Sequence, residues 1–223
     1  MKRIVVSLLI CVMVALGGPS IAAAADGSPV LSRIVKNGEL RVGMSGNQPP
    51  FTVKSKAGKL IGFEVDVANM LAGAMNVELK LVEIEFSKLL PALQSGEVDV
   101  VMSGMTMTPE RNLQVAFVGP YIVSGKSILT TSKTLAAIEA AQEINQENLK
   151  LTALRGSTSQ KFVEKAMPKA QLITVPDYDK AVQAVLEGRA DAMGPTSRSV
   201  PSASCATRTP ASPRSARLVH QGS

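Results

Sequence analysis

Cysteine and histidine are almost missing from this sequence. Its 223 residues include two cysteines and one histidine. Because these are Cys11, Cys205 and His220, residues 26–193 contain neither type. Zinc sites built from Cys and His, Ser-His-Asp catalysis and Cys-His catalysis are therefore excluded for that region. We expect no metal and no cofactor, and without disulfides this region must depend on its hydrophobic core.

An excess of positive charge is also missing from the central region, although the whole chain has a formal net charge of +6. Two of the 24 Lys and Arg lie within residues 1–25 and four follow Met193, whereas all 18 Asp and Glu lie within 26–193, which leaves that region neutral. Aromatic residues are few and do not alternate with basic ones. Because nucleic-acid binding needs a basic face or stacking platforms, we expect no nucleic-acid partner.

Long apolar runs are missing beyond the N-terminus. Two basic residues precede an apolar run at 4–16, and an alanine-rich stretch at 22–25 follows it. This order predicts a secretory signal peptide that is cleaved after Ala25. The run is short for a membrane span, and Cys11 inside it is poorly placed for lipid attachment. We expect a mature protein that is free in the periplasm.

The rest of the chain alternates short β-rich runs with helical patterns, which is typical of a parallel α/β sheet. The pattern restarts after a crossing run at 121–131, so it predicts two βαβαβ lobes. The expected β-rich runs are at 40–44, 77–84 and 98–104 in the first lobe and at 149–157, 170–175 and 190–193 in the second.

The second lobe also repeats part of the first in sequence. "FSKLLPALQSGEVDV" at 86–100 matches "YDKAVQAVLEGRADA" at 178–192 without a gap, so that Gly96 falls on Gly188. Shared packing explains nearly all of the matched positions, since each glycine ends a helix. In open α/β sheets, ligands bind beyond the carboxyl ends of the strands. Two such lobes joined near 118–125 predict a cleft that opens and closes about a hinge.

Three motifs in this order resemble those of the amino-acid-binding proteins of polar amino-acid ABC importers. They are "GFEVDVANML" at 62–71, "LLPALQSGEVDVVMSGMTMTPER" at 89–111 and "FVGPY" at 117–121. The resemblance extends from about Leu40 to Met193. It implies a periplasmic-binding-protein-like fold and a monomeric, non-enzymatic protein that captures a small amino acid and delivers it to an ABC permease in the inner membrane.

The segment around Arg111 fits an anion site on local grounds. Thr108 can cap a short helix that begins with Pro109, and Arg111 then leaves its first turn. A planar guanidinium is suited to a carboxylate, although a surface arginine paired with a nearby carboxylate would show the same spacing. The resemblance implies that Arg111 and Thr106 hold the ligand carboxylate, and that Gly104 and Thr106 accept from its ammonium group.

A second candidate anion site is "RGST" at 155–158. Gly156 permits a tight turn, and the N–H groups of Ser157 and Thr158 can meet an anion. An ordinary helix N-cap is the alternative interpretation. The resemblance implies that this loop completes the carboxylate site from the second lobe.

Phe86 and Phe51 are the candidates to pack on the ligand side chain, with core packing as the alternative. The resemblance places Phe86 at a platform position. It also places Gln48 where the family often has an aromatic residue and Ser45 where it often has Asp, which argues against a lysine or arginine ligand. Glu64 and Asp66 begin a helix two residues apart, which favours a role at the helix dipole over a catalytic pair.

Two other functions remain open at this stage. A periplasmic dehydratase acting on prephenate or arogenate would have the same fold, since fold alone does not define function. Such an enzyme would need a positioned acid between the lobes. A sensor ectodomain would need a transmembrane segment and a signalling domain downstream, and this sequence has neither.

The composition changes abruptly after Met193. Residues 194–223 contain four Pro, seven Ser and four Arg, with no Asp, Glu or Lys. The family pattern D-A-x-x-x-D begins at Asp191, yet Thr196 stands where the second Asp is expected. The sequence therefore predicts a signal peptide at 1–25, a first lobe at 26–120, a hinge strand and partial second lobe at 121–193, and an aberrant, disordered tail at 194–223.

We hypothesise a frameshift near codon 194, with an ordinary disordered tail as the alternative. Residues 26–223 should then bury the second sheet poorly, expose an apolar face and bind amino acids weakly or not at all. A chain that is continued in the other reading frame from codon 194 should bind an amino acid tightly. Resequencing the DNA across codon 194 and calorimetry on both versions test this. Micromolar binding and cooperative unfolding by the chain as written would refute it.

Overall fold

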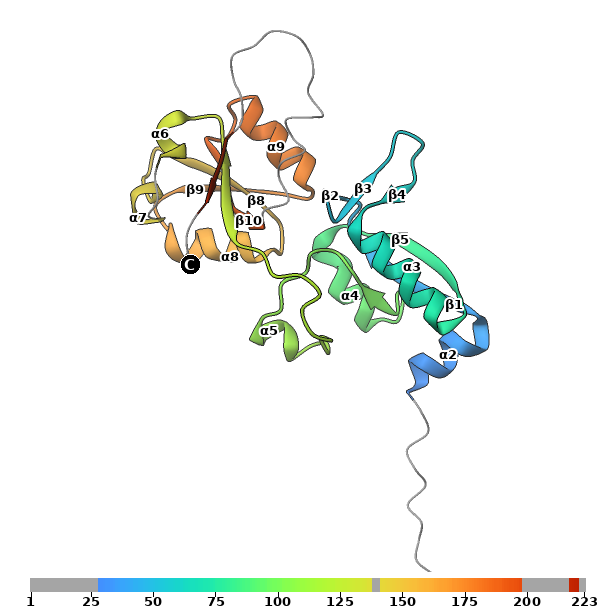
Figure 1. The fold of residues 1–223 in the computed structure, drawn as a ribbon. Coiled ribbons are helices and arrows are strands. Elements are labelled where there is room, and N and C mark those ends of the chain that lie inside the picture. The colour runs from blue at the N-terminus through green and yellow to red at the C-terminus, as the bar shows by residue number, and fades with distance from the viewer. Residues whose placement is uncertain (1–27, 138–140, 198–216, 221–223) are drawn as a thin grey trace, which may run out of the picture. The chain divides into compact units, whose positions relative to one another are not determined.

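The computed structural model describes residues 28–137, 141–197 and 217–220 (Figure 1). The predicted signal peptide and most of the predicted tail lie outside these residues. Within the described part, no helix is both long and apolar enough to cross a bilayer. Contacts divide the chain into two units at 1–37 and 38–223. In the first unit, helix α2 spans Pro29–Asn37 and has Ile34 buried, while Val30 and Val35 are exposed.

The first lobe is built on a three-stranded parallel sheet in the order β5-β1-β6. Apolar side chains of the central strand β1 are fully buried, with Leu40, Val42 and Met44 at most 1% exposed. The connections between these parallel strands contain helices, as βαβ units require. The elements are β1 (Glu39–Met44), α3 (Phe63–Met75), β5 (Glu78–Glu83), η1 (Phe86–Lys88), α4 (Leu89–Gln94), β6 (Val100–Val101) and α5 (Pro109–Asn112), with a small antiparallel sheet of β2 (Asn47–Gln48), β3 (Thr52–Lys54) and β4 (Leu60–Ile61).

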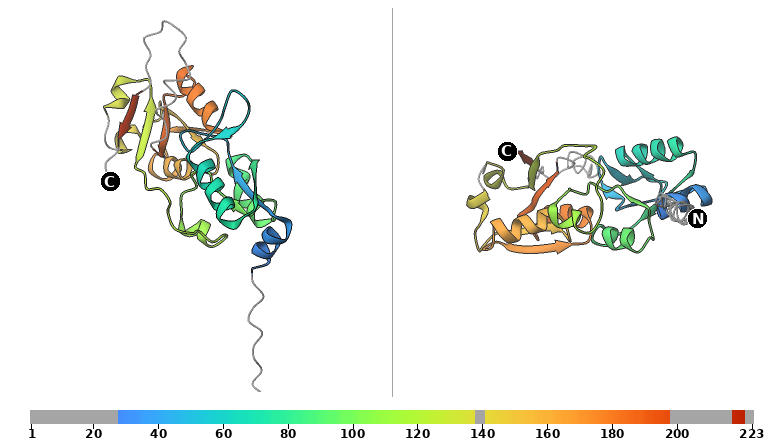
Figure 2. Two further views of the ribbon diagram at one scale, coloured as in Figure 1. Left: turned by 45° about the vertical axis from the view of Figure 1, so that its right-hand side comes forward. Right: turned by 90° about the horizontal axis from the view of Figure 1, so that it is seen from below.

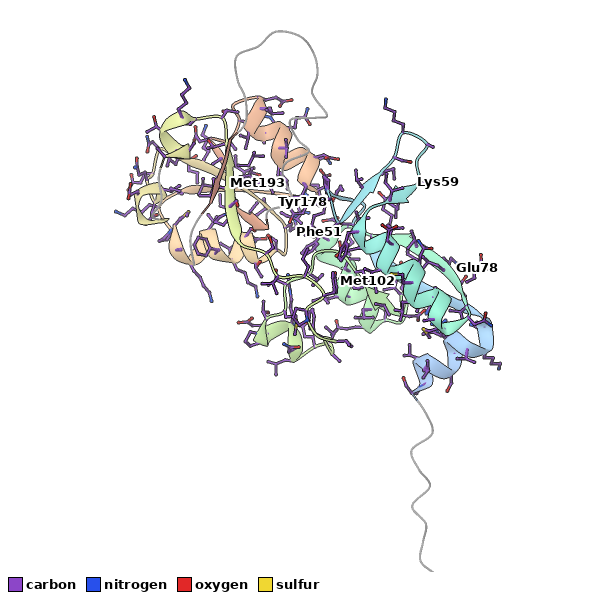
Figure 3. The ribbon with its side chains drawn as sticks, in the orientation of Figure 1. Phe51, Lys59, Glu78, Met102, Tyr178 and Met193 are labelled. Carbon is purple, nitrogen blue, oxygen red and sulfur yellow. The ribbon has the colours of Figure 1, made fainter. Side chains whose placement is uncertain are left out.

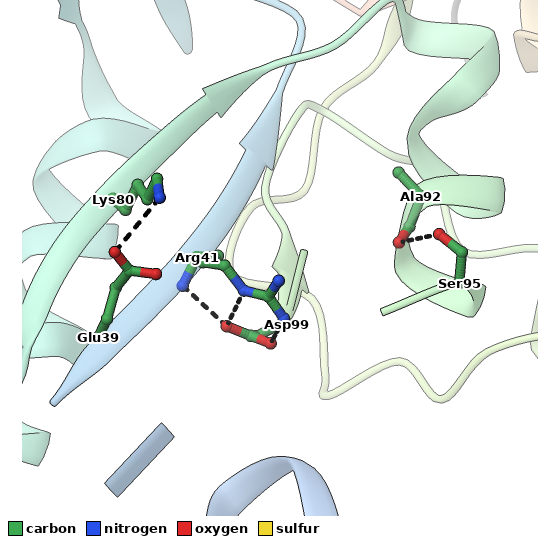
Figure 4. A network of polar contacts seen from close by, with 6 residues as sticks. All are labelled: Glu39, Arg41, Lys80, Ala92, Ser95 and Asp99. Atoms are coloured by element: carbon green, nitrogen blue, oxygen red, sulfur yellow. Dashed lines mark hydrogen bonds and ion pairs between the residues drawn. The ribbon is translucent and has the colours of Figure 1, made fainter. Parts of the chain in front are cut away.

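A partly buried ion pair joins β1 to the start of β6 (Figure 4). The Arg41 guanidinium donates to both oxygens of Asp99, with Nε–Oδ2 at 3.2 Å and Nη2–Oδ1 at 2.9 Å. The Arg41 backbone N–H donates to the same carboxylate at 2.9 Å. Only 2% of the Asp99 side chain is exposed. The hydrogen bond to Asp99 is the main reason why the pKa of Arg41 is raised.

The second lobe contains a five-stranded mixed sheet in the order β11-β7-β10-β8-β9 (Figure 2). Strand β8 runs parallel to β9 and β10, whereas β7 runs antiparallel to β10 and β11. The elements are β7 (Lys126–Thr130), α6 (Lys133–Ala136), α7 (Ala141–Ile144), β8 (Lys150–Leu154), α8 (Thr158–Ala166), β9 (Gln171–Val175), α9 (Tyr178–Leu186), β10 (Ala192–Ser197) and β11 (Arg217–His220).

Both faces of this sheet are covered by apolar clusters. Alternation along the strands sends Ile128 into one cluster, with Val163 of α8, and its neighbour Leu129 into the other, with Ala181 of α9. All three of the residues Ile128, Leu129 and Met193 are at most 3% exposed. The α/β class predicted from the alternating pattern is therefore confirmed, although the second sheet is mixed and not purely parallel.

In the described residues, the end of the second lobe differs from the expectation in three ways. The third strand of lobe two does not stop at Met193 but continues to Ser197, residues 217–220 form a further strand, and the second sheet is well buried. The sequence misled because Gly-Pro usually interrupts a strand. Here a Cβ at Gly194 would lie 2.9 Å from Val163 Cγ2, so close packing against α8 requires glycine, and the Pro195 carbonyl accepts a hydrogen bond from Ser159.

Lobe two has two moderately exposed apolar side chains, Phe162 (38%) and Ile173 (36%), but the most exposed apolar side chains of the described residues lie on the segment 113–123. Leu113 is 89% exposed, Val118 95% and Val123 89%. This segment has no regular secondary structure between α5 and β7. The described chain thus has a well-packed second sheet and an apolar connection that is open to solvent.

Removing the buried carboxylate of Asp99 should destabilise the first lobe. Asp99→Ala leaves the half-buried Arg41 charge without its bidentate partner, and we expect the free energy of unfolding to fall by about 2–4 kcal/mol. Urea unfolding followed by circular dichroism measures this. The control is Glu39→Ala, which breaks the exposed pair with Lys80 (3.4 Å) in the same sheet and should cost less than about 1 kcal/mol. Equal losses of stability in the two variants would contradict a special stabilising role for the Arg41–Asp99 pair.

Candidate functional site

Arg111 lies in α5, where the local sequence places it as expected. Thr108 is the N-cap of this helix and accepts from the Arg111 backbone N–H at 3.3 Å, and Pro109 occupies the first turn. The side chain is not on the surface, because Arg111 is only 7% exposed. Its guanidinium donates to the Thr106 carbonyl (Nη1–O 2.7 Å) and to the Gly156 carbonyl (Nη2–O 3.0 Å). The alternative of a surface arginine is therefore wrong.

These two carbonyls belong to different lobes. Thr106 precedes α5, while Gly156 lies between β8 and α8. Burial lowers the pKa of the Arg111 guanidinium, but arginine remains charged at neutral pH. A positive charge held between two neutral carbonyl oxygens is a ready partner for an anion, because a carboxylate would replace them with stronger, charge-assisted bonds.

The second-lobe loop at 155–158 also contacts the Arg111 guanidinium, through the Gly156 carbonyl. Ser157 is the N-cap of α8 and accepts from the Gln160 N–H at 3.1 Å, so the N-cap interpretation is confirmed for this residue. Gly156 has a φ of +74°, as the tight turn requires. The Thr158 hydroxyl lies 3.4 Å from the hydroxyl of Thr106. The structure thus brings together the predicted residues Arg111, Thr106, Ser157 and Thr158.

The two predicted platform residues have different surroundings. The Phe86 ring lies 5.8 Å from the guanidinium carbon of Arg111, within the range of a cation–π contact. Phe86 also belongs to a buried cluster with Leu89 and Leu154. Phe51 is equally buried, but none of the described contacts joins it to Arg111. Phe86 therefore belongs to the candidate site, and core packing remains the better description of Phe51.

Gly104 is held by a buried carboxylate that the sequence interpretation undervalued. Its backbone N–H donates to Glu64 Oε1 at 2.6 Å, and Glu64 is 0% exposed. The same carboxylate accepts from the hydroxyls of Thr52 (2.9 Å) and Tyr121 (2.5 Å). Burial, followed by the charge of Glu64, raises the pKa of Tyr121. Glu64 is thus a buried acceptor that fixes the Gly104 loop, whereas Asp66 is exposed as its helix-dipole role predicts.

Tyr178 is a site residue that the sequence analysis did not select, and it contacts Gln48, which was noted there only as a departure from the family pattern. Tyr178 begins α9 (Figure 3) and packs against the cluster of Phe86. Its hydroxyl accepts from Gln48 Nε2 at 3.3 Å, although the two residues are 130 positions apart. The internal repeat carried a signal, since it aligns Tyr178 with Phe86. The described residues therefore form a connected group of a buried cation, two aromatic rings and polar loop atoms from two α/β lobes.

Two α/β lobes joined by a crossing segment, with a buried arginine that contacts loops of both, are the features to compare with those of known proteins. A model of the bacterial extracellular solute-binding proteins, family 3, matches residues 40–191. The chain belongs to this family.

Curated relatives of the chain include both binding proteins and an enzyme. A cyclohexadienyl dehydratase of Pseudomonas aeruginosa is 31% identical over 163 residues, which cover 73% of this chain and 61% of that protein. The arginine-binding protein 1 of Escherichia coli is 30% identical (69% and 61% covered), and a glutamine-binding protein of Geobacillus stearothermophilus is 32% identical (75% and 64%). The chain spans less than two thirds of the length of these relatives.

Solved structures agree with this assignment. An ancestral amino acid-binding protein, described as a precursor of cyclohexadienyl dehydratase, superposes with a TM-score of 0.75 at 34% identity, covering 86% of this chain and 81% of that chain. A binding component of an ABC transporter from Wolinella succinogenes, complexed with lysine, gives a TM-score of 0.71 at 36% identity and covers 82% and 76%. The predicted two-lobed fold is thereby confirmed.

Removal of the Glu64 carboxylate should lower stability sharply. Glu64→Ala leaves three donors without their acceptor, two of them tied to the Gly104 loop and to the crossing segment, and we expect a loss of about 3 kcal/mol in the free energy of unfolding. Asp66→Ala, in the same helical turn but exposed, should cost less than about 1 kcal/mol. Urea melts of the two variants give the comparison. A loss below about 1 kcal/mol for Glu64→Ala would show that the network is unimportant.

Proposed function

We propose that this chain is an amino-acid receptor whose binding centre is the buried guanidinium of Arg111. One observation carries the proposal: Arg111 is 7% exposed and donates to carbonyl oxygens from both lobes. A ligand carboxylate can replace these carbonyls and keep the two loops joined through the same cation. Such exchange would favour the closed arrangement when ligand is present.

The other groups of an amino acid ligand would also find partners among the residues near Arg111. The carboxylate would also meet the N–H groups at the start of α8, and the side chain would lie on Phe86. The ammonium group would use the Gly104 carbonyl and the Thr106 hydroxyl. The second-lobe carboxylate that the family usually supplies is replaced by Thr196, within β10. The ammonium group is therefore held by neutral acceptors, which favours modest affinity.

The family and the expected export signal support delivery to a membrane permease as part of this proposal. Family members are described as extracellular, and several relatives are named as parts of ABC transporters. We infer a periplasmic monomer that hands its ligand to an inner-membrane ABC permease.

A dehydratase is the second candidate, favoured by the similarity to cyclohexadienyl dehydratase. The reaction would need a protonated acid. Burial, followed by the neighbouring Asp177, raises the pKa of Asp179 next to Tyr178, but none of the described contacts joins its exposed carboxyl to Arg111. Liquid chromatography for phenylpyruvate after incubation with prephenate separates the two functions. A pure receptor forms none.

The receptor function depends on Arg111. Arg111→Ala should raise the dissociation constant for the preferred amino acid at least about tenfold, because a charge-assisted bidentate contact is lost. The control is Arg189→Ala, which removes an exposed arginine paired with Glu187 and should leave affinity unchanged. Calorimetry on the mature chain, with thermal unfolding to confirm that each variant is folded, makes the measurement. Equal affinity in the folded Arg111 variant would refute the proposed anchor.

A further inference from the structure

The side chain of Gln48 contains a buried polar atom without a partner. Gln48 is 2% exposed, and its Nε2 donates to the Tyr178 hydroxyl at 3.3 Å. Its Oε1 is fully buried and accepts no hydrogen bond within the described part of the chain. A buried amide oxygen without a donor is destabilising, so native proteins keep such atoms chiefly where a ligand or water satisfies them.

This oxygen lies beside the residues assigned to the ligand. A Cβ on Gly104 would lie 2.5 Å from Gln48 Nε2 and 2.7 Å from Oε1, so the amide packs directly on the Gly104 backbone. On its other side the amide reaches Tyr178, which shares a cluster with Phe86. The Phe86 ring in turn lies next to Arg111. Gln48 is therefore connected by direct contacts to the carboxylate anchor.

The polar groups around this amide are already engaged or neutral. Ser45 is buried; its N–H donates to Ser103 Oγ at 3.0 Å, and its hydroxyl oxygen accepts from Ser103 Oγ at 2.9 Å. The buried carboxylate of Glu64 accepts from three donors. Because these bonds occupy both oxygens of Glu64, a cationic ligand side chain would have no free carboxylate in these groups for a bidentate ion pair. An apolar one would leave Oε1 unsatisfied, and an anionic one would be repelled by it.

We propose that Gln48 selects the ligand side chain, and that the ligand is an amino acid with an uncharged side-chain donor, as in the carboxamides of glutamine and asparagine. The side-chain N–H donates to Gln48 Oε1 while Arg111 holds the α-carboxylate. This inference rests on the proposed receptor function.

The test compares L-glutamine with L-methionine, which has similar length but no donor. Calorimetry or ligand-observed NMR on the mature chain, with ligand up to millimolar concentration, gives the ratio of the two dissociation constants. We expect glutamine to bind about tenfold more tightly. In Gln48→Met the preference should vanish through loss of glutamine affinity, whereas Gln94→Met, at an exposed position of α4, should keep it.

A second variant makes the test independent of any defect in Gln48→Met. Gln48→Glu keeps the shape and adds a charge, so it should shift the preference from glutamine toward L-lysine by at least about tenfold. Unchanged glutamine preference in both folded variants, or a wild-type preference for methionine or lysine, would overturn the role of Gln48 and leave the receptor function standing. Binding of no amino acid by the wild-type chain would overturn both.

Discussion

The contact on which the binding arrangement depends is the buried guanidinium of Arg111 between two carbonyl oxygens. A desolvated charge must be surrounded by acceptors, and here one acceptor comes from each lobe. The cation therefore sets the separation of the loops at Thr106 and Gly156. The short cap at Thr108 and the turn at Gly156 are the local devices that bring these carbonyls to it.

Behind this contact, a second buried charge of opposite sign organises the first lobe. The Glu64 carboxylate bonds to the hairpin at Thr52, the loop at Gly104 and the crossing segment at Tyr121. A movement of the crossing segment would be transmitted to the Gly104 loop through a single side chain. This links the part of the chain expected to act as a hinge with the loop expected to hold the ligand.

The sequence predicted much of this from patterns that reflect local physics. Alternation of strand and helix gave the lobes, and the Thr-Pro-x-Arg spacing gave the position of Arg111. Contacts between residues far apart in sequence could not be predicted in the same way. The burial of Glu64, the contact from Gln48 to Tyr178 and the continuation of the strand through Gly194 depend on residues far apart in sequence, and none of them leaves a periodic trace.

The open segment at 113–123 has a consequence for the life of the chain in a cell. Side chains such as Leu113, Val118 and Val123, which are 89–95% exposed, are what chaperones and proteases recognise in incompletely covered proteins. Within the same segment, only the Tyr121 hydroxyl is tied to the buried Glu64 carboxylate among the contacts described above. The lifetime of this protein in a cell should therefore depend on the exposure of this segment as well as on the stability of its two sheets.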